Sequence, residues 1–157
     1  MTLGELKQSL GDTAQFEVKS PFIVDFDAIA VRQNGEIQFY ILYLAGEPAG
    51  DDDPIQGLWT DNPAYTTAEG VGAGTLISTA EDAYGDATLS FSYDNEGREY
   101  VRFANHPAPN ISFGTGNANT STAGIYPEFS GGFNETQEYN PDATIQSVLL
   151  VCLADGC

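Results

Sequence analysis

The chain opens with apolar positions at helical spacing. Leucines recur three and four positions apart over residues 3–10, which is the period of one face of an α-helix. Thr2 and Glu5 have the spacing of a capping box at the start of this segment. Gly11 stands where a left-handed C-cap belongs. The pattern therefore predicts a helix over residues 3–10.

A similar pattern recurs near the middle of the chain. Thr75 opens a second segment with an apolar stripe, and a Gly-Asp pair at residues 85–86 ends it, as another at residues 11–12 ends the first. Aligning the two segments needs one inserted residue, and a capped helix with such a stop also arises by coincidence. We interpret the pattern as a tandem duplication of a helix-plus-hairpin unit, with pseudo-repeat halves at residues 1–45 and 70–113.

Extended runs follow each predicted helix. Asn34-Gly35 is a strong hairpin signal because both residues tolerate positive φ, and residues 94–97 form the corresponding polar turn of the second half. Strands are predicted at residues 15–18, 22–31, 36–45, 87–93, 98–104, 111–113 and 144–153. The expected fold class is α+β: a single domain over residues 1–157, with one antiparallel sheet, two short helices on one face, and a core shared by the two halves.

Two irregular regions interrupt the predicted strands. Residues 46–54 form an acidic connector between the halves. Residues 114–142 are rich in Gly, Asn, Ser and Thr but carry scattered aromatic side chains. Loops of this length in a compact domain either have a function or are held by their own side chains. We expect the second region to be a long loop held on the sheet by its aromatics, with a binding role as the further hypothesis.

The composition is strongly acidic. The chain has 23 Asp and Glu against 5 Lys and Arg, for a formal net charge of -18. Such a charge repels nucleic acids and anionic lipids and attracts cations or basic proteins, although it also serves solubility alone. No apolar run approaches the length of a membrane span. We therefore expect no nucleic-acid partner and no membrane insertion.

Both cysteines lie at the C-terminal end of the chain. Cys152 and Cys157 have a spacing that closes a small disulfide loop, and so short a loop contributes only about 2 kcal/mol in the chain-entropy model. No histidine or second cysteine pair accompanies them, which argues against zinc. The disulfide predicts an oxidising compartment. We therefore expect a secreted or periplasmic protein from which a leader peptide has been removed.

Catalytic motifs are sparse in the sequence. His106 is the single histidine, and no G-x-S-x-G nucleophile motif is present. Asp25 and Asp27 flank Phe26 on a predicted strand, so both carboxylates would project from one face at a separation of about 7 Å, as in a glycosidase-like pair. The same pattern occurs on the solvent face of an ordinary edge strand. We expect a protein that is not an enzyme, with a carboxylate-dependent hydrolase as the weaker alternative.

Two sets of side chains are candidates for binding. The carboxylates of Asp51, Asp52 and Asp53 are hard oxygen ligands that suit calcium, although an acidic run between prolines is also typical of a solvated turn. The candidate aromatic platform for a ligand consists of Trp59, Tyr65, Tyr126 and Phe129. A lone tryptophan also serves as a core anchor, so this alternative stays open. Apart from a structural calcium ion, no cofactor is expected.

The second half carries a pattern found in bacterial envelope proteins. A glycine-rich run at residues 70–74 precedes the second predicted helix, which ends near residues 84–85, and a strand pair through residues 98–103 follows. This order resembles small bacterial envelope lipoproteins of the outer-membrane-assembly and beta-lactamase-inhibitor-protein-like fold, and the whole chain is similar to secreted proteins of cyanobacteria. The resemblance implies a non-catalytic envelope domain. The chain departs from it at residues 86–87, where Asp-Ala replaces a residue-proline pair, and in lacking the second helix and the disulfide of each repeat.

These observations define the expected function. The first hypothesis is a non-enzymatic secreted or periplasmic module that binds a protein or a glycan through its polar sheet face and long loop. The alternative is a structural subunit of an extracellular surface layer or filament, which assembles with copies of itself. Both hypotheses rest on the shortage of catalytic groups in the sequence rather than on a motif that identifies a ligand.

Overall fold

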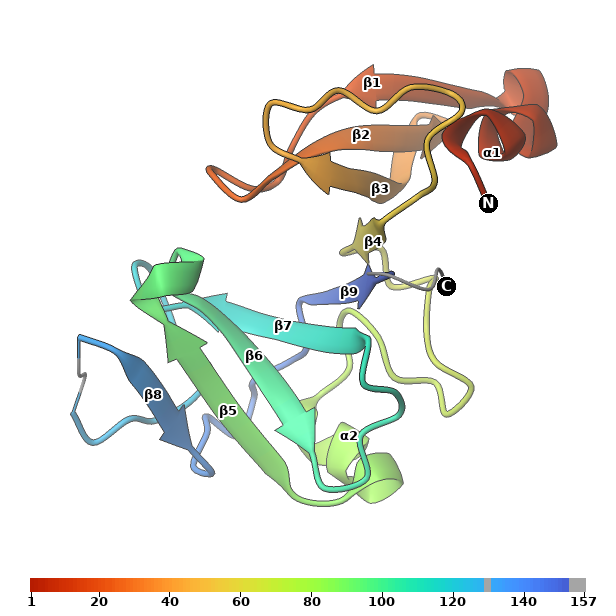
Figure 1. Ribbon diagram of the computed structural model, residues 1–157. Helices are drawn as coiled ribbons and strands as arrows, with labels where there is room; N and C mark the ends of the chain where they lie inside the picture. Colours follow the sequence, from red (N-terminus) through yellow and green to blue (C-terminus); the bar gives the residue numbers. More distant parts are fainter. Residues whose placement is uncertain (129–130, 153–157) are drawn as a thin grey trace. The chain divides into compact units, whose positions relative to one another are not determined.

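The computed structural model describes residues 1–128 and 131–152 (Figure 1). Within this part of the chain the residues form two compact units. Unit 1 comprises Met1–Asn62 together with the C-terminal stretch that begins at Leu150, and unit 2 comprises Pro63–Leu149. Unit 1 is therefore built from two separate stretches of chain, whereas unit 2 is continuous.

The fold is mostly β, so the expected α+β class is wrong. The described residues form nine strands, whereas the two α-helices have only 8 residues each. Two short strands account for much of the difference: β4 (Gly57–Thr60) follows the acidic connector, and β8 (Phe133–Thr136) lies inside the region expected to be an irregular loop. These segments are too short to show a pattern of their own, and they are defined by their pairing with neighbouring strands.

The expected tandem duplication with a shared core is wrong as well. α1 (Leu3–Leu10) begins at a complete capping box with Thr2 as the N-cap, as predicted. α2 (Ile77–Tyr84) begins after Leu76, which makes no side-chain cap, so Thr75 does not take the place of Thr2. Each helix also packs in a hydrophobic core of its own unit rather than in one core shared by both halves.

Unit 1 contains an antiparallel meander of four strands. In the order in which they are hydrogen-bonded, the strands are β1 (Ala14–Val18), β2 (Phe26–Gln33), β3 (Glu36–Leu44) and β4 (Figure 1). A 3-10 turn at Gly11–Thr13 links α1 to β1. Asn34 and Gly35, with φ of 53° and 86°, connect β2 to β3. The pairing of Gln33 with Glu36 across this two-residue turn confirms the predicted hairpin.

α1 packs on one face of these strands and completes the core of unit 1. Alternate residues of β2 and β3 point toward the helix, as the two-residue period of a strand requires. The buried members of this core are Leu3, Ile29, Val31, Ile41 and Tyr43. The opposite face of β3 carries Tyr40, whose ring meets the ring of Trp59 in β4 edge-on at 5.2 Å. Both faces of β3 are therefore apolar.

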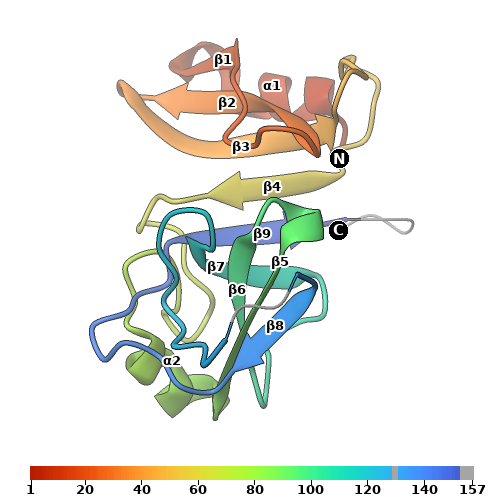
Figure 2. The ribbon, with the colours of Figure 1, turned by 90° about the vertical axis from the view of Figure 1, so that its left-hand side faces the viewer.

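Unit 2 has its own antiparallel strands and its own helix. Its strands are hydrogen-bonded in the order β7 (Ile111–Asn117), β6 (Arg98–Phe103), β5 (Ala87–Ser92) and β8. Figure 2 shows β8 beside β5. A 3-10 turn at Tyr93–Asn95 joins β5 to β6. β9 (Ser147–Val151) begins in unit 2 and ends in unit 1. No helix among the described residues is long and apolar enough to cross a membrane.

The core of unit 2 forms between α2 and the strands. α2 contributes Ile77, Ala80 and Tyr84, each at most 4% exposed. Val101 and Phe103 alternate along β6 toward this core, and Phe113 of β7 completes an aromatic group with Tyr84 and Phe103. The predicted alternation of β6 is thus present. One buried residue of the same face, Glu99, is charged rather than apolar.

The capping box gives the first prediction. Thr2→Ala removes the hydroxyl that accepts from the Glu5 N–H at 3.2 Å, and loss of an N-cap costs about 1 kcal/mol of folding free energy. Ser9→Ala, on an exposed position of the same helix, is the matched control and should leave stability unchanged or slightly raised, because alanine has the higher helix propensity. Urea unfolding of the two variants measures the difference, and equal midpoints would contradict the role of Thr2.

Candidate functional site

A buried carboxylate organises the long loop of unit 2. The side chain of Glu99 in β6 is 0% exposed. Its Oε2 atom accepts hydrogen bonds from the Thr115 hydroxyl at 2.9 Å and the Ala123 N–H at 2.7 Å. Its Oε1 atom accepts from the Gly124 N–H and the Tyr126 hydroxyl, both at 2.9 Å. We call Glu99 and these four donors the Glu99 clamp.

The local sequence makes room for this carboxylate. Glu99 shares the inward face of β6 with Val101 and Phe103, and the register between β6 and β7 shifts between Glu99 and Tyr100. A Cβ atom on Gly124 would lie 2.9 Å from Oε1, closer than real Cβ contacts allow. The absence of a side chain at this glycine therefore permits the loop backbone to reach the carboxylate.

The donors around Glu99 explain how a charge is tolerated in the interior. Removing a carboxylate from water is costly unless hydrogen bonds replace those of the solvent, and here four donors do so. Burial, followed by the charge of Glu99, raises the pKa of the Tyr126 phenol. Tyr126 consequently keeps its proton and stays a donor at neutral pH. The clamp ties β7 and residues 123–126 of the long loop to β6.

Two further tyrosine–carboxylate bonds hold unit 2 together. The Tyr139 hydroxyl of the long loop donates to Glu81 Oε2 of α2 at 2.7 Å. The Tyr84 hydroxyl of α2 donates to Glu69 Oε2 at 2.5 Å. Burial, and then the hydrogen bond to Glu81, raise the pKa of Tyr139 to about 12. The hydrogen bond from Tyr84 lowers the pKa of Glu69. The long loop is therefore fixed at both β6 and α2.

A polar cleft of about 280 Å³ opens beside the Glu99 clamp. It is lined by Thr115, Ser121, Thr122, Ala123, Asn140, Asp142, Ala143, Thr144 and Gln146. Two of these residues, Thr115 and Ala123, are members of the clamp. Asn140 is held by a hydrogen bond from its side-chain amide to the Ala123 carbonyl at 3.1 Å. Through its hydrogen bonds to Thr115 and Ala123, Glu99 thus fixes part of the wall of the polar cleft.

Several polar groups in the polar cleft are available to a ligand. Within residues 1–128 and 131–152, the side chains of Ser121, Asp142, Thr144 and Gln146 have no hydrogen-bonding partner. Hydroxyl and amide groups both donate and accept, whereas an ionised carboxylate only accepts. A ligand that both donates and accepts hydrogen bonds would therefore match this set.

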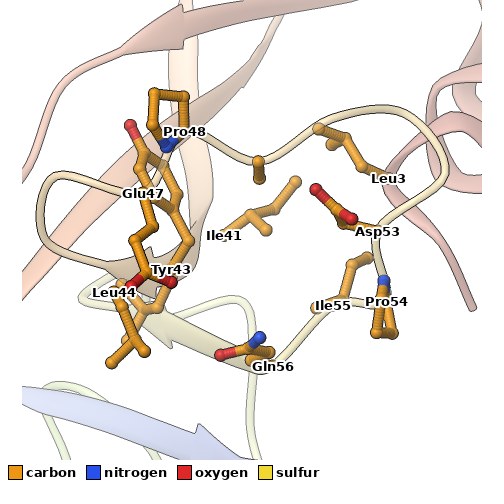
Figure 3. A pocket seen from close by; sticks show the side chains of 12 residues that line it. Leu3, Ile41, Tyr43, Leu44, Glu47, Pro48, Asp53, Pro54, Ile55 and Gln56 are labelled. Carbon is orange, nitrogen blue, oxygen red and sulfur yellow. The ribbon is translucent and has the colours of Figure 1, made fainter.

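A second cavity, which we call the apolar pocket, lies in unit 1. It has a volume of about 270 Å³ and is lined by Leu3, Ile41, Leu42, Tyr43, Leu44, Glu47, Pro48, Ala49, Asp53, Pro54, Ile55 and Gln56. Figure 3 shows Ile41 near its centre, with Leu3 and Ile55 around it and the Asp53 carboxylate directed inward. Most of its lining residues are aliphatic or proline, but polar and apolar atoms contribute similar shares of the surface that they present to the pocket. The carboxylates of Glu47 and Asp53 give it an acidic margin.

The acidic run predicted as a calcium site makes contacts within unit 1. Asp51 pairs with Lys7 at 2.6 Å, and Asp53 Oδ2 accepts from the Gly50 N–H at 2.7 Å. The backbone carbonyls of Asp51 and Asp53 accept from the first N–H groups of α1. Asp52 is exposed. Across the part of the chain that the structure describes, no group of three or more His, Cys, Asp or Glu side chains could hold a metal ion.

The predicted aromatic platform is divided between the units. Trp59 is half-buried in unit 1, between Tyr40 and Phe22, with a ring separation of 6.2 Å to Phe22. Tyr65, at 40% exposed, and Tyr126 of the Glu99 clamp belong to unit 2. Phe129 lies outside the described residues. Trp59 is therefore placed to serve as a packing residue of unit 1.

Of the two cysteines predicted to form a disulfide, Cys152 lies among the described residues. Cys152 is buried and disulfide-bonded, and its backbone N–H donates to the Gln56 carbonyl at 2.7 Å. Cys157, the other member of the predicted disulfide, lies outside the described residues. The secreted or periplasmic location expected from this pair stays a prediction.

The candidate catalytic residues do not line either cavity. Asp25 precedes β2, and the Asp27 carboxylate accepts from the Gly46 N–H at 2.9 Å. The His106 ring stacks on Phe103 at 6.4 Å, and its Nε2 atom lies 3.0 Å from the Ile111 carbonyl. His106 Nδ1 accepts from the Phe103 N–H at 3.4 Å, so both ring nitrogens are engaged in holding the connection between β6 and β7.

Sequence reasoning missed Glu99 and the polar cleft. The alternation of β6 places residue 99 on the same face as Val101 and Phe103, and this was the available signal, but a glutamate at a core position contradicts the pattern that identifies cores. The cleft is built from residues up to 31 positions apart, which no local pattern connects. Comparisons with protein-family models, curated proteins and solved structures find no match to the chain. The kind of ligand that the polar cleft could bind therefore has to be inferred from its lining residues and their contacts.

The Glu99 clamp predicts a large effect of a nearly isosteric change. Glu99→Gln replaces one acceptor oxygen by an NH₂ group that faces other donors, so we expect a loss of about 2–4 kcal/mol in the free energy of unfolding. Tyr126→Phe removes one donor and should cost about 1–2 kcal/mol. Glu36→Gln, on an exposed position of β3, is the control with the same change of charge. Denaturant unfolding measures all three, and a Glu99→Gln variant as stable as Glu36→Gln would contradict the clamp.

The raised pKa of Tyr139 predicts a loss of stability in alkali. The folded protein keeps the Tyr139 proton until pH about 12, whereas the ordinary tyrosine value is 10.0. Its contribution to stability is therefore complete below pH 10 and is lost as the pH rises toward 12. In Tyr139→Phe the slope of unfolding free energy against pH in this window should be smaller. Urea unfolding at a series of alkaline pH values measures the slope, and identical slopes in both proteins would contradict the prediction.

Proposed function

We propose that the protein is a non-enzymatic binding module whose polar cleft takes a neutral saccharide. The observation that supports this most directly is the set of hydroxyl, amide and carboxylate groups of Ser121, Asp142, Thr144 and Gln146 around one open cleft, which have no hydrogen-bonding partner among the described residues. Saccharide hydroxyls donate and accept hydrogen bonds, as these groups do. The proposal places binding on the long loop, where a rigid scaffold commonly carries function.

The chemistry of the lining favours a neutral ligand over an ionic one. The lining of the polar cleft includes no lysine or arginine, and the chain as a whole has a net charge of -18, so an anionic ligand would be repelled. Asp142 is a single carboxylate that can accept from two neighbouring hydroxyl groups. The volume of about 280 Å³ is near the lower end of the range of small-molecule sites, at about 300 Å³, which suits one sugar unit.

The Glu99 clamp supports binding by holding the cleft in shape. Thr115 and Ala123 are fixed through Glu99, and Asn140 is fixed through Ala123. A site that is ordered before the ligand arrives loses less conformational entropy on binding. This matters for saccharides, because their hydroxyl groups exchange water for protein with a small net gain for each hydrogen bond.

The non-enzymatic part of the proposal rests on the carboxylates of the cleft. Hydrolysis of a glycosidic bond generally uses two carboxyl groups, about 5–10 Å apart, on either side of the bond. Asp142 is the one acidic residue among the lining residues, and Glu99 is occupied by its four donors. The bonded state of Cys152 supports a secreted or periplasmic location, where glycans are common ligands.

Titration with neutral sugars tests the proposal. Glucose, galactose, xylose and N-acetylglucosamine are added in turn to ¹⁵N-labelled protein, and we expect at least one to shift the amide signals of Ser121, Thr122, Asn140 and Ala143. Asp142→Asn and Gln146→Ala should each weaken that binding by about three- to tenfold, because each removes a hydrogen bond to the ligand. Asp82→Asn, on an exposed position of α2, is the control and should bind normally.

Two results would contradict the proposal. If none of the sugars shifts these signals, or if Asp142→Asn binds as the unmodified protein does, the cleft is not a saccharide site. If the protein releases reducing sugar from oligosaccharides of the bound unit, and Asp142→Asn abolishes the release, the module is an enzyme.

A further inference from the structure

We infer that the apolar pocket of unit 1 is a second binding site, which takes a basic peptide segment by inserting one of its apolar side chains. The inference is independent of the saccharide proposal because every residue of the apolar pocket belongs to unit 1 and every residue of the polar cleft belongs to unit 2. It rests on the shape, the lining and the charge of the pocket.

The bottom of the pocket is formed by core residues. Leu3 of α1 and Ile41 of β3 are almost wholly covered, at 2% exposed each, and Figure 3 shows both beside the space enclosed by the connector after β3. The apolar groups that a ligand can reach are Leu44, which is 49% exposed, and the half-buried Ala49 and Ile55. Ligand sites combine apolar surface with a few polar groups that orient the ligand. These three residues therefore offer contacts to an aliphatic or aromatic side chain.

The connector that covers the pocket is held by α1. The Leu3 N–H donates to the Asp53 carbonyl at 3.0 Å, and the Gly4 N–H donates to the Asp51 carbonyl at 2.8 Å. A Cβ atom on Gly4 would lie 2.9 Å from the Asp51 carbonyl oxygen, so glycine permits this close approach. The wall of the pocket is thus fixed by backbone hydrogen bonds, and a ligand would not have to order it.

The volume suits a single large side chain. An engineered cavity of about 150 Å³ is sufficient to hold benzene, and the apolar pocket has about 270 Å³. A leucine or phenylalanine side chain therefore fits with part of its backbone at the opening. Burying each additional CH₂ group of such a side chain contributes about 0.8 kcal/mol, so the pocket should discriminate strongly between leucine and alanine.

The charge of the margin selects a basic partner. Glu47 and Asp53 line the pocket, and Asp52 is exposed beside them. Lys7 pairs with Asp51 and leaves the other three charges to act on a ligand. Complementary charge increases the rate and the specificity of association, whereas an acidic segment would be repelled. Lysine or arginine on either side of the inserted residue would meet this margin.

Three short peptides test the inference. The probes are acetylated and amidated Arg-Leu-Arg, Arg-Ala-Arg and Glu-Leu-Glu, each titrated into ¹⁵N-labelled protein. We expect Arg-Leu-Arg to shift the amide signals of Ala49, Ile55 and Gln56 and to bind at least about tenfold more tightly than Arg-Ala-Arg. Glu-Leu-Glu should not bind. Added salt at about 1 M, where charges are screened beyond about 3 Å, should weaken the binding of Arg-Leu-Arg.

Variants separate the two parts of the site. Glu47→Gln and Asp53→Asn should each weaken the binding of Arg-Leu-Arg by about two- to fivefold, whereas Glu36→Gln, an exposed glutamate at the start of β3, should not. Ala49→Leu fills the pocket and should abolish binding, and an unchanged spectrum away from the connector would show that it is folded.

Three outcomes would overturn the inference. These are equal binding of the leucine and alanine peptides, equal binding by Glu47→Gln and Glu36→Gln, and the absence of any shift at residues 49–56. Shifts at residues 51–53 with calcium chloride that also block the peptide would assign the margin to a metal ion instead.

Discussion

The burial of the Glu99 carboxylate constrains the structure of unit 2 more than any other interaction described here. A charge in the interior has to be surrounded by donors, and the donors come from β7 and from residues 123–126 of the long loop. If the loop left β6, the Glu99 carboxylate would either be exposed to solvent or stay buried without its hydrogen-bond donors. Because Thr115 and Ala123 also line the polar cleft, the requirement that stabilises the loop also determines the shape of the candidate site.

Local patterns predicted the features that depend on neighbouring residues. The capping box at Thr2 and the hairpin at Asn34-Gly35 follow from side-chain and backbone preferences within a few positions, and both are present. β4 and β8 were missed because four-residue strands are defined by their partners. Glu99 was missed because its donors lie 16 to 27 positions further along the chain. The sequence revealed the tyrosines of the long loop as aromatic rings, whereas in the structure their hydroxyl groups make the critical contacts.

The two cavities show how an acidic chain can offer different chemistry in different places. In the polar cleft the one carboxylate, Asp142, stands among hydroxyl and amide groups. In the apolar pocket, Glu47 and Asp53 stand at the margin of aliphatic side chains. The side chains of the acidic run are the basis of the calcium prediction, which stays a prediction. Its backbone carbonyls receive the first N–H groups of α1, a role that does not depend on which side chains the run carries.

The divided composition of unit 1 has a consequence for how the protein is made. Translation proceeds from the N-terminus, so all of unit 2 has been synthesised before residues 150–152 exist, and these residues complete unit 1 beside β4 through the Cys152–Gln56 hydrogen bond. Until residues 150–152 are in place, residues 1–62 therefore lack the part of β9 that completes their unit. An unpaired strand edge is prone to association with other chains. The nascent protein thus passes through a stage in which the edge at β4 is open to other chains.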